Sequence, residues 1–249
     1  MESIPDRPSP IGVTAGERRW RIEHHRGDAA ALHLLDPPGR PARVARVLTV
    51  GRPTVVLGSA QSDAVVDAGR AASRGLDVTR RRSGGGAVLL VPGEHVWVDL
   101  FVPAGDPLWD DDVVVAADWV GAAWQRALIR LGIGHTTLHR GAADDAPWSR
   151  LVCFAGRGPG EVLVGGRKLV GVSQRRTRDW VRAQTAVHLR WTPGRLVEVL
   201  SLDADERHRL AETLGDAVAT VAVDAAEGAP DPVERADQVL EALAAALPD

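Results

Sequence analysis

The chain has 249 residues, 45% hydrophobic and 25% charged, so it is long enough to bury a core as a single domain. Its formal net charge of −3 gives no basic field of the kind that attracts nucleic acid, and we expect no nucleic-acid partner. No apolar run approaches the roughly 20 residues that span a bilayer, and no signal-peptide pattern is present, so we expect a cytoplasmic protein without membrane contact.

The predicted elements, taken in chain order, begin after a proline-rich lead-in over residues 1–12 that we expect to be disordered. The first half of the chain is predicted to form a helix over 14–35, two short strands within 43–58, a helix over 62–75, a strand over 77–81, and a β-hairpin of strands 87–91 and 95–102. The second half is predicted to form a long helix over 110–131, strands over 151–155, 161–164, 167–174 and 180–190, and a tail from residue 192 whose two helical pieces flank the polar linker 224–232.

Strands flanked by a few long helices, without regular alternation of strand and helix, indicate an α+β fold with a mixed, largely antiparallel sheet. We expect a single domain over residues 13–200, followed by a C-terminal helical tail over residues 201–249.

A segment rich in arginine and glycine follows the strand predicted at 77–81. Its residues are Arg80, Arg81, Arg82, Ser83, Gly84, Gly85, Gly86 and Ala87. Glycines let a backbone approach a ligand closely and direct N–H groups at an anion, and adjacent guanidinium groups bind phosphate or carboxylate oxygens. The segment therefore predicts an anion site. The alternative is a flexible surface hairpin with solvated arginines.

Lys168 is the single lysine among 30 basic residues, and it follows a glycine turn at Gly165-Gly166. Arginine replaces lysine readily on a surface, but not where a compact ammonium must lie against a reacting oxygen. An ammonium presented at the head of a strand can offset negative charge that develops on a carboxylate, a carbonyl or a phosphate. We therefore predict that Lys168 is catalytic. The alternative is a solvated lysine in a hairpin turn.

Cys153 is the only cysteine, so it cannot form an internal disulfide. Strand alternation would place its thiol on one face with Leu151 and Ala155, as a small buried hydrophobe. It also precedes Lys168 by one predicted hairpin, so the ammonium could lie near the thiol and favour a nucleophilic thiolate. Both interpretations remain open. The eight histidines form no cluster with cysteine or carboxylates in the sequence, and we expect no metal site.

Two ordered motifs resemble those of the biotin/lipoate A/B protein ligase family, in its lipoate–protein ligase and cysteine octanoyltransferase branch. Residues 80–88 resemble the Arg-Arg-x-Ser-Gly-Gly-Gly-Ala-Val motif of lipoate–protein ligases, and residues 166–171 resemble their lysine motif. Residues 54–58 with Gln61, and Ser173 with Gln174, are also similar to the family. The resemblance covers roughly residues 14–200 and implies a catalytic domain of the biotin and lipoate ligase type.

In the ligase branch, the resemblance implies that ATP, with Mg²⁺, converts lipoate or octanoate to an acyl-adenylate. The acyl group is then passed to a lysine of an apo lipoyl domain or a glycine-cleavage H-type carrier protein. Lys168 would contact the carbonyl and phosphate oxygens. The other implied binding residues are Arg80, Arg81, Ser83, Gly84, Gly85, Gly86, Ala87, Gly166, Gly171, Ser173 and Gln174. This is our first hypothesis.

The cysteine octanoyltransferase branch takes the acyl group from a thioester on an acyl carrier protein. The spacing of Cys153-Phe154 before Lys168 resembles that branch, whereas the three consecutive glycines at 84–86 are ligase-like. This is our second hypothesis. The chain departs from both branches at Leu90-Val91, where they have His-Asp, and at 184–186, where they have His-Gly. These departures motivate a third hypothesis, a non-catalytic acyl-binding relative.

Overall fold

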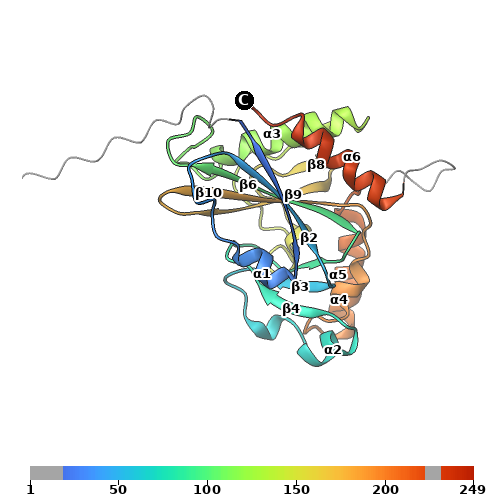
Figure 1. The fold of residues 1–249 in the computed structure, drawn as a ribbon. Helices are drawn as coiled ribbons and strands as arrows, with labels where there is room; N and C mark the ends of the chain where they lie inside the picture. Colours follow the sequence, from blue (N-terminus) through green and yellow to red (C-terminus); the bar gives the residue numbers. More distant parts are fainter. Residues whose placement is uncertain (1–18, 222–230) are drawn as a thin grey trace, which may run out of the picture.

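The structure, a computed structural model, describes residues 19–221 and 231–249, which form two β-sheets with helices packed on them (Figure 1). The lead-in predicted over residues 1–12 lies outside the described residues, as does most of the linker predicted over residues 224–232. The two sheets lie one above the other in Figure 1, with helices α3 and α6 at the opposite end of the molecule from helix α2.

The larger sheet has seven strands in the order β1-β2-β6-β10-β9-β8-β7. The strands are β1 Arg21–Gly27, β2 Val44–Val50, β6 His95–Pro103, β7 Thr136–Leu138, β8 Val162–Val164, β9 Arg167–Arg176 and β10 Trp180–His188. The β1–β2 pair is parallel, and the other neighbouring pairs are antiparallel. The predicted α+β class with a mixed, largely antiparallel sheet is confirmed.

The smaller sheet has three strands, β3 Thr54–Leu57, β4 Asp77–Arg80 and β5 Val88–Leu90, in the order β4-β3-β5. Strands β3 and β4 are parallel and are connected through helix α2 Ala68–Ser73. The hairpin predicted from strands 87–91 and 95–102 is wrong, because β5 pairs with β3 whereas β6 pairs with β2 and β10. Strand β6 is buried along nearly its whole length between these two long neighbours, so it has no free edge for β5.

The helix predicted over residues 14–35 is wrong over residues 21–27, which form the edge strand β1. A buried strand, β2, offers this segment a full row of parallel pairing, and that tertiary partner overrides its helical spacing. Only Ala29–Leu34 is helical, as α1, with the Asp28 carboxylate accepting a hydrogen bond from Ala31 N at 2.7 Å.

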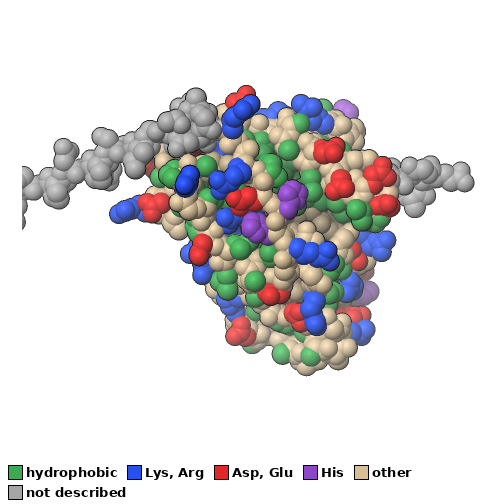
Figure 2. Space-filling view, in the orientation of Figure 1, with side chains coloured by type: hydrophobic (Ala, Val, Ile, Leu, Met, Phe, Trp, Pro, Cys, Tyr) green, Lys and Arg blue, Asp and Glu red, His purple; other side chains and the backbone are tan. Residues whose placement is uncertain are grey.

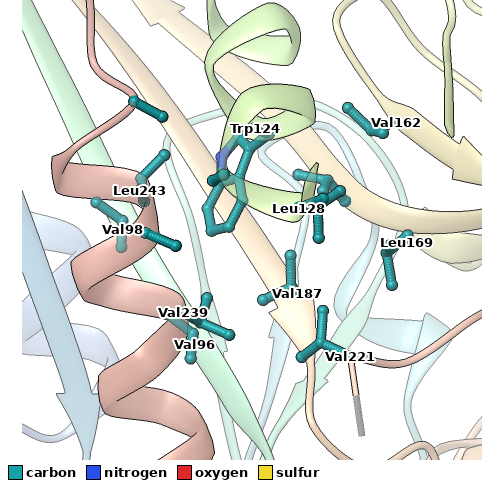
Figure 3. Close-up of a cluster of buried hydrophobic side chains, with 14 of the residues drawn as sticks. Val96, Val98, Trp124, Leu128, Val162, Leu169, Val187, Val221, Val239 and Leu243 are labelled. Carbon is teal, nitrogen blue, oxygen red and sulfur yellow. The ribbon is translucent and has the colours of Figure 1, made fainter. Parts of the chain in front are cut away.

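Helices α3 Val115–Arg130 and α6 Pro232–Ala244 cover one face of the larger sheet (Figure 1). Figure 3 shows Trp124 of α3 at the centre of this core, between α6 residues and side chains from β6 and β10. The long helix predicted over 110–131 is confirmed, although it begins at residue 115 because the Asp112 carboxylate accepts hydrogen bonds from Val114 N and Val115 N.

The smaller sheet packs against the C-terminal helices α4 Pro193–Val197 and α5 Ala204–Ala217. Leu210 and Leu214 of α5 are fully buried in the same core as Val55 and Leu57 of β3. The helices of the predicted C-terminal tail therefore contribute to both hydrophobic cores, α5 to that of the smaller sheet and α6 to that of the larger sheet. These two cores hold the two sheets in place, and residues of both sheets line the candidate site.

Candidate active site

A cavity of about 600 Å³ opens between the glycine-rich loop 84–86, the segment 143–159 and strand β9. Beside it lies a narrow apolar slot of about 50 Å³, lined by residues of α1, β5, β6, β9 and β10. Cys153, Val172 and Ser173 line both spaces. Cys153 therefore lies at the junction between the open cavity and the apolar slot.

The segment around Cys153 is not the predicted strand. Residues Cys153–Ala155 form a short 3-10 helix, so the alternation that would have placed the thiol with Leu151 and Ala155 does not apply. The chain turns here because Phe154 packs into the core while Cys153 stays partly exposed. The prediction that Cys153 is simply a core residue in a strand is wrong.

The glycine-rich loop packs directly on this segment. Cys153 N donates to Ala87 O at 2.9 Å, and Ala87 N donates to Leu151 O at 2.8 Å. A Cβ atom at Gly86 would lie 2.6 Å from Val152 N, and one at Gly58 would lie 1.8 Å from Gly85 O. Glycine at these positions is therefore required for the backbone contact, which holds Cys153 against the loop.

We predict that Gly86→Ala destabilises the protein by about 1–3 kcal/mol, because its methyl group would overlap the backbone at residue 152. Gly84→Ala is the matched control, since a Cβ there meets no atom within 4 Å. Thermal unfolding should show a Tm several degrees lower for Gly86→Ala and nearly unchanged for Gly84→Ala. Equal Tm values for the two variants would contradict the close-contact interpretation.

The arginines of the motif hold the loop in shape. The Arg81 guanidinium is buried and donates to Gly84 O at 2.7 Å and to Gly86 O at 2.9 Å. Arg80 donates to Gly58 O at 2.8 Å and pairs with Asp63. Both guanidinium groups are thus engaged by protein oxygens, and the guanidinium groups that line the cavity are those of Arg150 and Arg157.

Lys168 lies at the wall of the cavity, with only 3% of its surface exposed. Its Nζ donates to Cys153 O at 2.8 Å and lies 2.7 Å from Glu161 Oε2, and it sits 5.2 Å from the centre of the Phe154 ring. The Glu161 carboxylate also accepts hydrogen bonds from Gly158 N at 2.7 Å and Val172 N at 3.2 Å. A buried ion pair therefore fixes the ammonium beside the Cys153 backbone.

The pKa of Glu161 is raised above its usual value by burial, while the Lys168 ammonium and the two backbone N–H donors act in the opposite direction. Glu161 was not predicted as a site residue. Its sequence context, an acidic residue just before a short strand, carries no sign that it would face a lysine of the next strand.

Most of the predicted site residues meet at these two spaces. Those lining the cavity are Gly84, Gly85, Gly86, Cys153, Lys168, Ser173 and Gln174. Arg81 and Gly171 line the slot. The other predicted residues, which line neither the cavity nor the slot, are Arg80, Ser83, Ala87 and Gly166. A Cβ at Gly171 would lie 2.8 Å from Cζ of Phe154, so this glycine leaves room for the ring.

His188 packs behind the site, edge-on to Phe154 with ring centroids 4.6 Å apart. Burial lowers the pKa of His188 to about 3, with a further contribution from His95. In the unfolded chain the His188 imidazole binds a proton near pH 6.5. The contribution of the neutral, buried imidazole to stability is therefore fully present above that pH and is lost as the pH falls toward 3.

We therefore predict that the free energy of unfolding falls by about 3 kcal/mol between pH 6.5 and pH 4 through His188. His188→Gln should reduce the loss of stability between the two pH values by about this amount in urea unfolding, while His33 and His95, whose pKa values are also lowered, keep their own contributions. His208→Gln is the matched control, because the His208 side chain is 75% exposed. An unchanged slope in the His188→Gln variant would contradict the assignment.

Within residues 19–221 and 231–249, no group of three or more His, Cys, Asp or Glu side chains could hold a metal ion. No helix in these ranges combines the length and apolar character needed to cross a membrane. Figure 2 shows acidic and basic side chains interspersed over the face in view, so this face presents no large patch of one charge.

A buried ammonium beside a cysteine, at the mouth of an apolar slot, defines a site suited to acyl-group chemistry. The model of the lipoyl protein ligase A/B catalytic domain matches residues 34–244, and the chain belongs to this family. It is therefore an enzyme, a ligase or an acyltransferase, which sets aside the non-catalytic alternative.

One similar curated protein is an octanoyltransferase, LipM, from Kyrpidia tusciae, which is 29% identical over 245 residues, covering 92% of this chain and 87% of that protein. Among solved structures, the bi-partite lipoate protein ligase of Thermoplasma acidophilum has a TM-score of 0.66 at 19% identity, covering 92% of this chain and 82% of that one. A lipoate-protein ligase A bound with ATP has a TM-score of 0.64 at 18% identity, covering 91% and 82%. These likenesses to solved structures show the fold.

Proposed function

We propose that this enzyme transfers an octanoyl or lipoyl group from a carrier thioester to a lysine of a carrier protein, through an acyl intermediate on Cys153. The observation that supports this most strongly is the position of Cys153, which lines both the cavity and the apolar slot. An acyl tail in the slot would bring its carbonyl carbon to the thiol. The similarity to an octanoyltransferase agrees with this route.

The proposed reaction has two steps. The Cys153 sulfur first attacks the donor's carbonyl carbon, so that a thioester to Cys153 forms, the bond to the donor sulfur breaks, and the thiol proton leaves with the donor thiol. The amine of the acceptor lysine then attacks the Cys153 thioester. An amide forms, and Cys153 leaves with a proton from the amine. The net result is acyl transfer with no oxidant, reductant or nucleotide consumed.

Lys168 would stabilise the negative oxygen that develops in each step. An ammonium has three N–H donors, and the described structure engages Lys168 Nζ with Cys153 O and Glu161 Oε2. The third donor is available for an oxyanion. Because the ammonium is already desolvated and held by two partners, its charge would act on the intermediate without reorganisation.

The slot is narrow, with a volume of about 50 Å³ against about 600 Å³ for the neighbouring cavity. A medium-length acyl chain therefore enters only if lining side chains change rotamer, as interface side chains commonly do on binding. Val88 and Leu90 of the short strand β5 line the slot and are the aliphatic side chains on its smaller-sheet side.

An ATP-dependent ligase reaction is the second candidate. The cavity is large, the glycine-rich loop lines it, and a ligase with this fold binds ATP. However, the described lining contains as many carboxylates as cations: Arg150, Arg157 and Lys168 against Asp144, Asp145 and Glu161. A triphosphate is better matched by an excess of positive charge. The site therefore favours a neutral thioester donor over ATP with Mg²⁺.

The acceptor would be an apo lipoyl domain or a glycine-cleavage H-type protein, and the donor an acyl carrier protein. The archaeal ligase of the same fold is described together with its E2 lipoyl domain. The cytoplasm remains the compartment expected from the sequence.

The test is a mass measurement on an apo lipoyl domain incubated with the enzyme. One reaction contains octanoyl-acyl carrier protein without nucleotide, and the other contains lipoate, ATP and Mg²⁺. We expect an octanoyl mass increase in the first reaction. Without acceptor, the enzyme itself should gain an octanoyl group on the peptide that contains Cys153, and hydroxylamine should remove it. Modification that occurs only with ATP would overturn the proposal and favour the ligase.

A further inference from the structure

His33 of helix α1 lines the apolar slot but is itself polar and 96% buried, since only 4% of its surface is exposed. Its ring packs on Trp97 with centroids 4.4 Å apart. The Arg182 guanidinium, paired with Asp99, donates to His33 O at 2.9 Å and to Leu32 O at 3.2 Å. These contacts hold both the helix end and the imidazole in place.

A chain of hydrogen bonds determines which ring nitrogen carries the proton. Ser83 Oγ donates to Gln184 Oε1 at 2.6 Å, which orients the amide so that Gln184 Nε2 faces His33 Nδ1 at 3.3 Å. His33 Nδ1 is therefore the acceptor, and Nε2 carries the hydrogen in a neutral ring. This function for Ser83 was not foreseen from the motif.

The imidazole stays neutral under physiological conditions. Burial, together with the charges of Arg182 and Arg81, lowers the pKa of His33 to about 3. His33 Nε2 is fully buried and has no hydrogen-bond partner among the residues that the structure describes. A buried N–H donor without an acceptor is costly, so an occupant that widened the slot as far as Nε2 and supplied an acceptor there would be favoured.

Building on the proposed function, we propose that His33 is a specificity-determining residue that selects acyl groups with a hydrogen-bond acceptor on the distal part of the chain. Such groups include hydroxy- or oxo-acyl chains and the sulfur-bearing lipoyl group, in preference to a plain hydrocarbon chain of the same length. A hydrocarbon tail fills the slot but leaves the His33 donor unpaired. One buried hydrogen bond of this kind corresponds to about a tenfold preference.

Binding of free acids tests this without requiring turnover. The dissociation constants of octanoate, 6-, 7- and 8-hydroxyoctanoate and lipoate are measured by calorimetry on the wild-type protein. We expect at least one acceptor-bearing acid to bind about tenfold more tightly than octanoate. Equal binding of all five acids, or no binding of any, would overturn the proposal.

Two variants assign the preference to His33. His33→Leu removes the donor and should reduce the tenfold preference to near unity, mainly by weakening the acceptor-bearing acid. His33→Gln keeps an N–H donor near the position of Nε2 and should retain most of the preference. A preference that survives in His33→Leu would show that another group selects the chain.

A measurement on the wild-type protein covers the case in which His33→Leu does not fold. With ¹⁵N-labelled histidine, the Nε2 resonance that is absent from His33→Gln should shift on adding the preferred acid and not on adding octanoate. The absence of any difference between the two acids would contradict the proposal. If binding shows the preference but no donor supports transfer, the proposed function fails while the role of His33 stands.

Discussion

Replacing Lys168 by arginine is expected to reduce acyl transfer by about a hundredfold, although the charge is kept. Lys168 Nζ lies between Glu161 Oε2 at 2.7 Å and Cys153 O at 2.8 Å, in a site with 3% exposure. A planar guanidinium is larger than an ammonium and would have to displace the Phe154 ring or leave the Glu161 carboxylate. The measurement is kcat/KM for transfer to an apo lipoyl domain.

Arg167→Lys provides the matched control, because it exchanges the same two residue types one position away, on an exposed side chain. It should leave kcat/KM within about twofold of wild type, as is usual for a surface substitution. Near-normal transfer by Lys168→Arg, with both variants folded, would remove Lys168 from the proposed mechanism.

Replacing Cys153 by serine is expected to reduce transfer from octanoyl-acyl carrier protein by on the order of a thousandfold or more. A serine hydroxyl is a far weaker nucleophile than a thiol near neutral pH, and the site holds no base at hydrogen-bond distance from the Cys153 side chain among the described residues. The measurement is the rate of octanoyl addition to the acceptor, together with loss of the acyl-enzyme.

The same variant separates the two candidate reactions. The substitution is small and the position is partly exposed, so Cys153→Ser should keep the wild-type Tm. If the enzyme is a ligase acting through an adenylate, the variant should retain transfer from lipoate and ATP, because that route needs no thiol. Retained transfer from the thioester donor would instead exclude Cys153 as the nucleophile.

The sequence pattern was sufficient to predict features that depend on residues close together in the chain. The glycines at 84–86 were predicted to allow a close backbone approach to a ligand. In the structure Gly86 makes such an approach to the protein's own backbone, because a Cβ atom there would collide with residues 152 and 153. Lys168 could be singled out because it is the one ammonium in an arginine-rich chain. Gly84, Gly85, Gly86 and Lys168 all line the cavity.

The sequence pattern predicted the wrong secondary structure or strand pairing where a partner far away in the chain determined the conformation. The segment 21–27 has helical spacing but forms a strand, since β2 supplies its hydrogen-bond partners. Strands β5 and β6 are joined by a short turn but belong to different sheets, because each finds its partner elsewhere. Neither outcome depends on residues inside the segment itself.

The sequence by itself predicted the family, the glycine-rich loop and a place for Lys168 at the site, because these depend on residue types at fixed short spacings. Only the tertiary structure decided that Glu161 pairs with Lys168, and that Ser83 and Gln184 orient His33. The physical reason is that these contacts join separate strands and a helix far apart in the chain. Their geometry exists only once the two sheets have packed together around the slot.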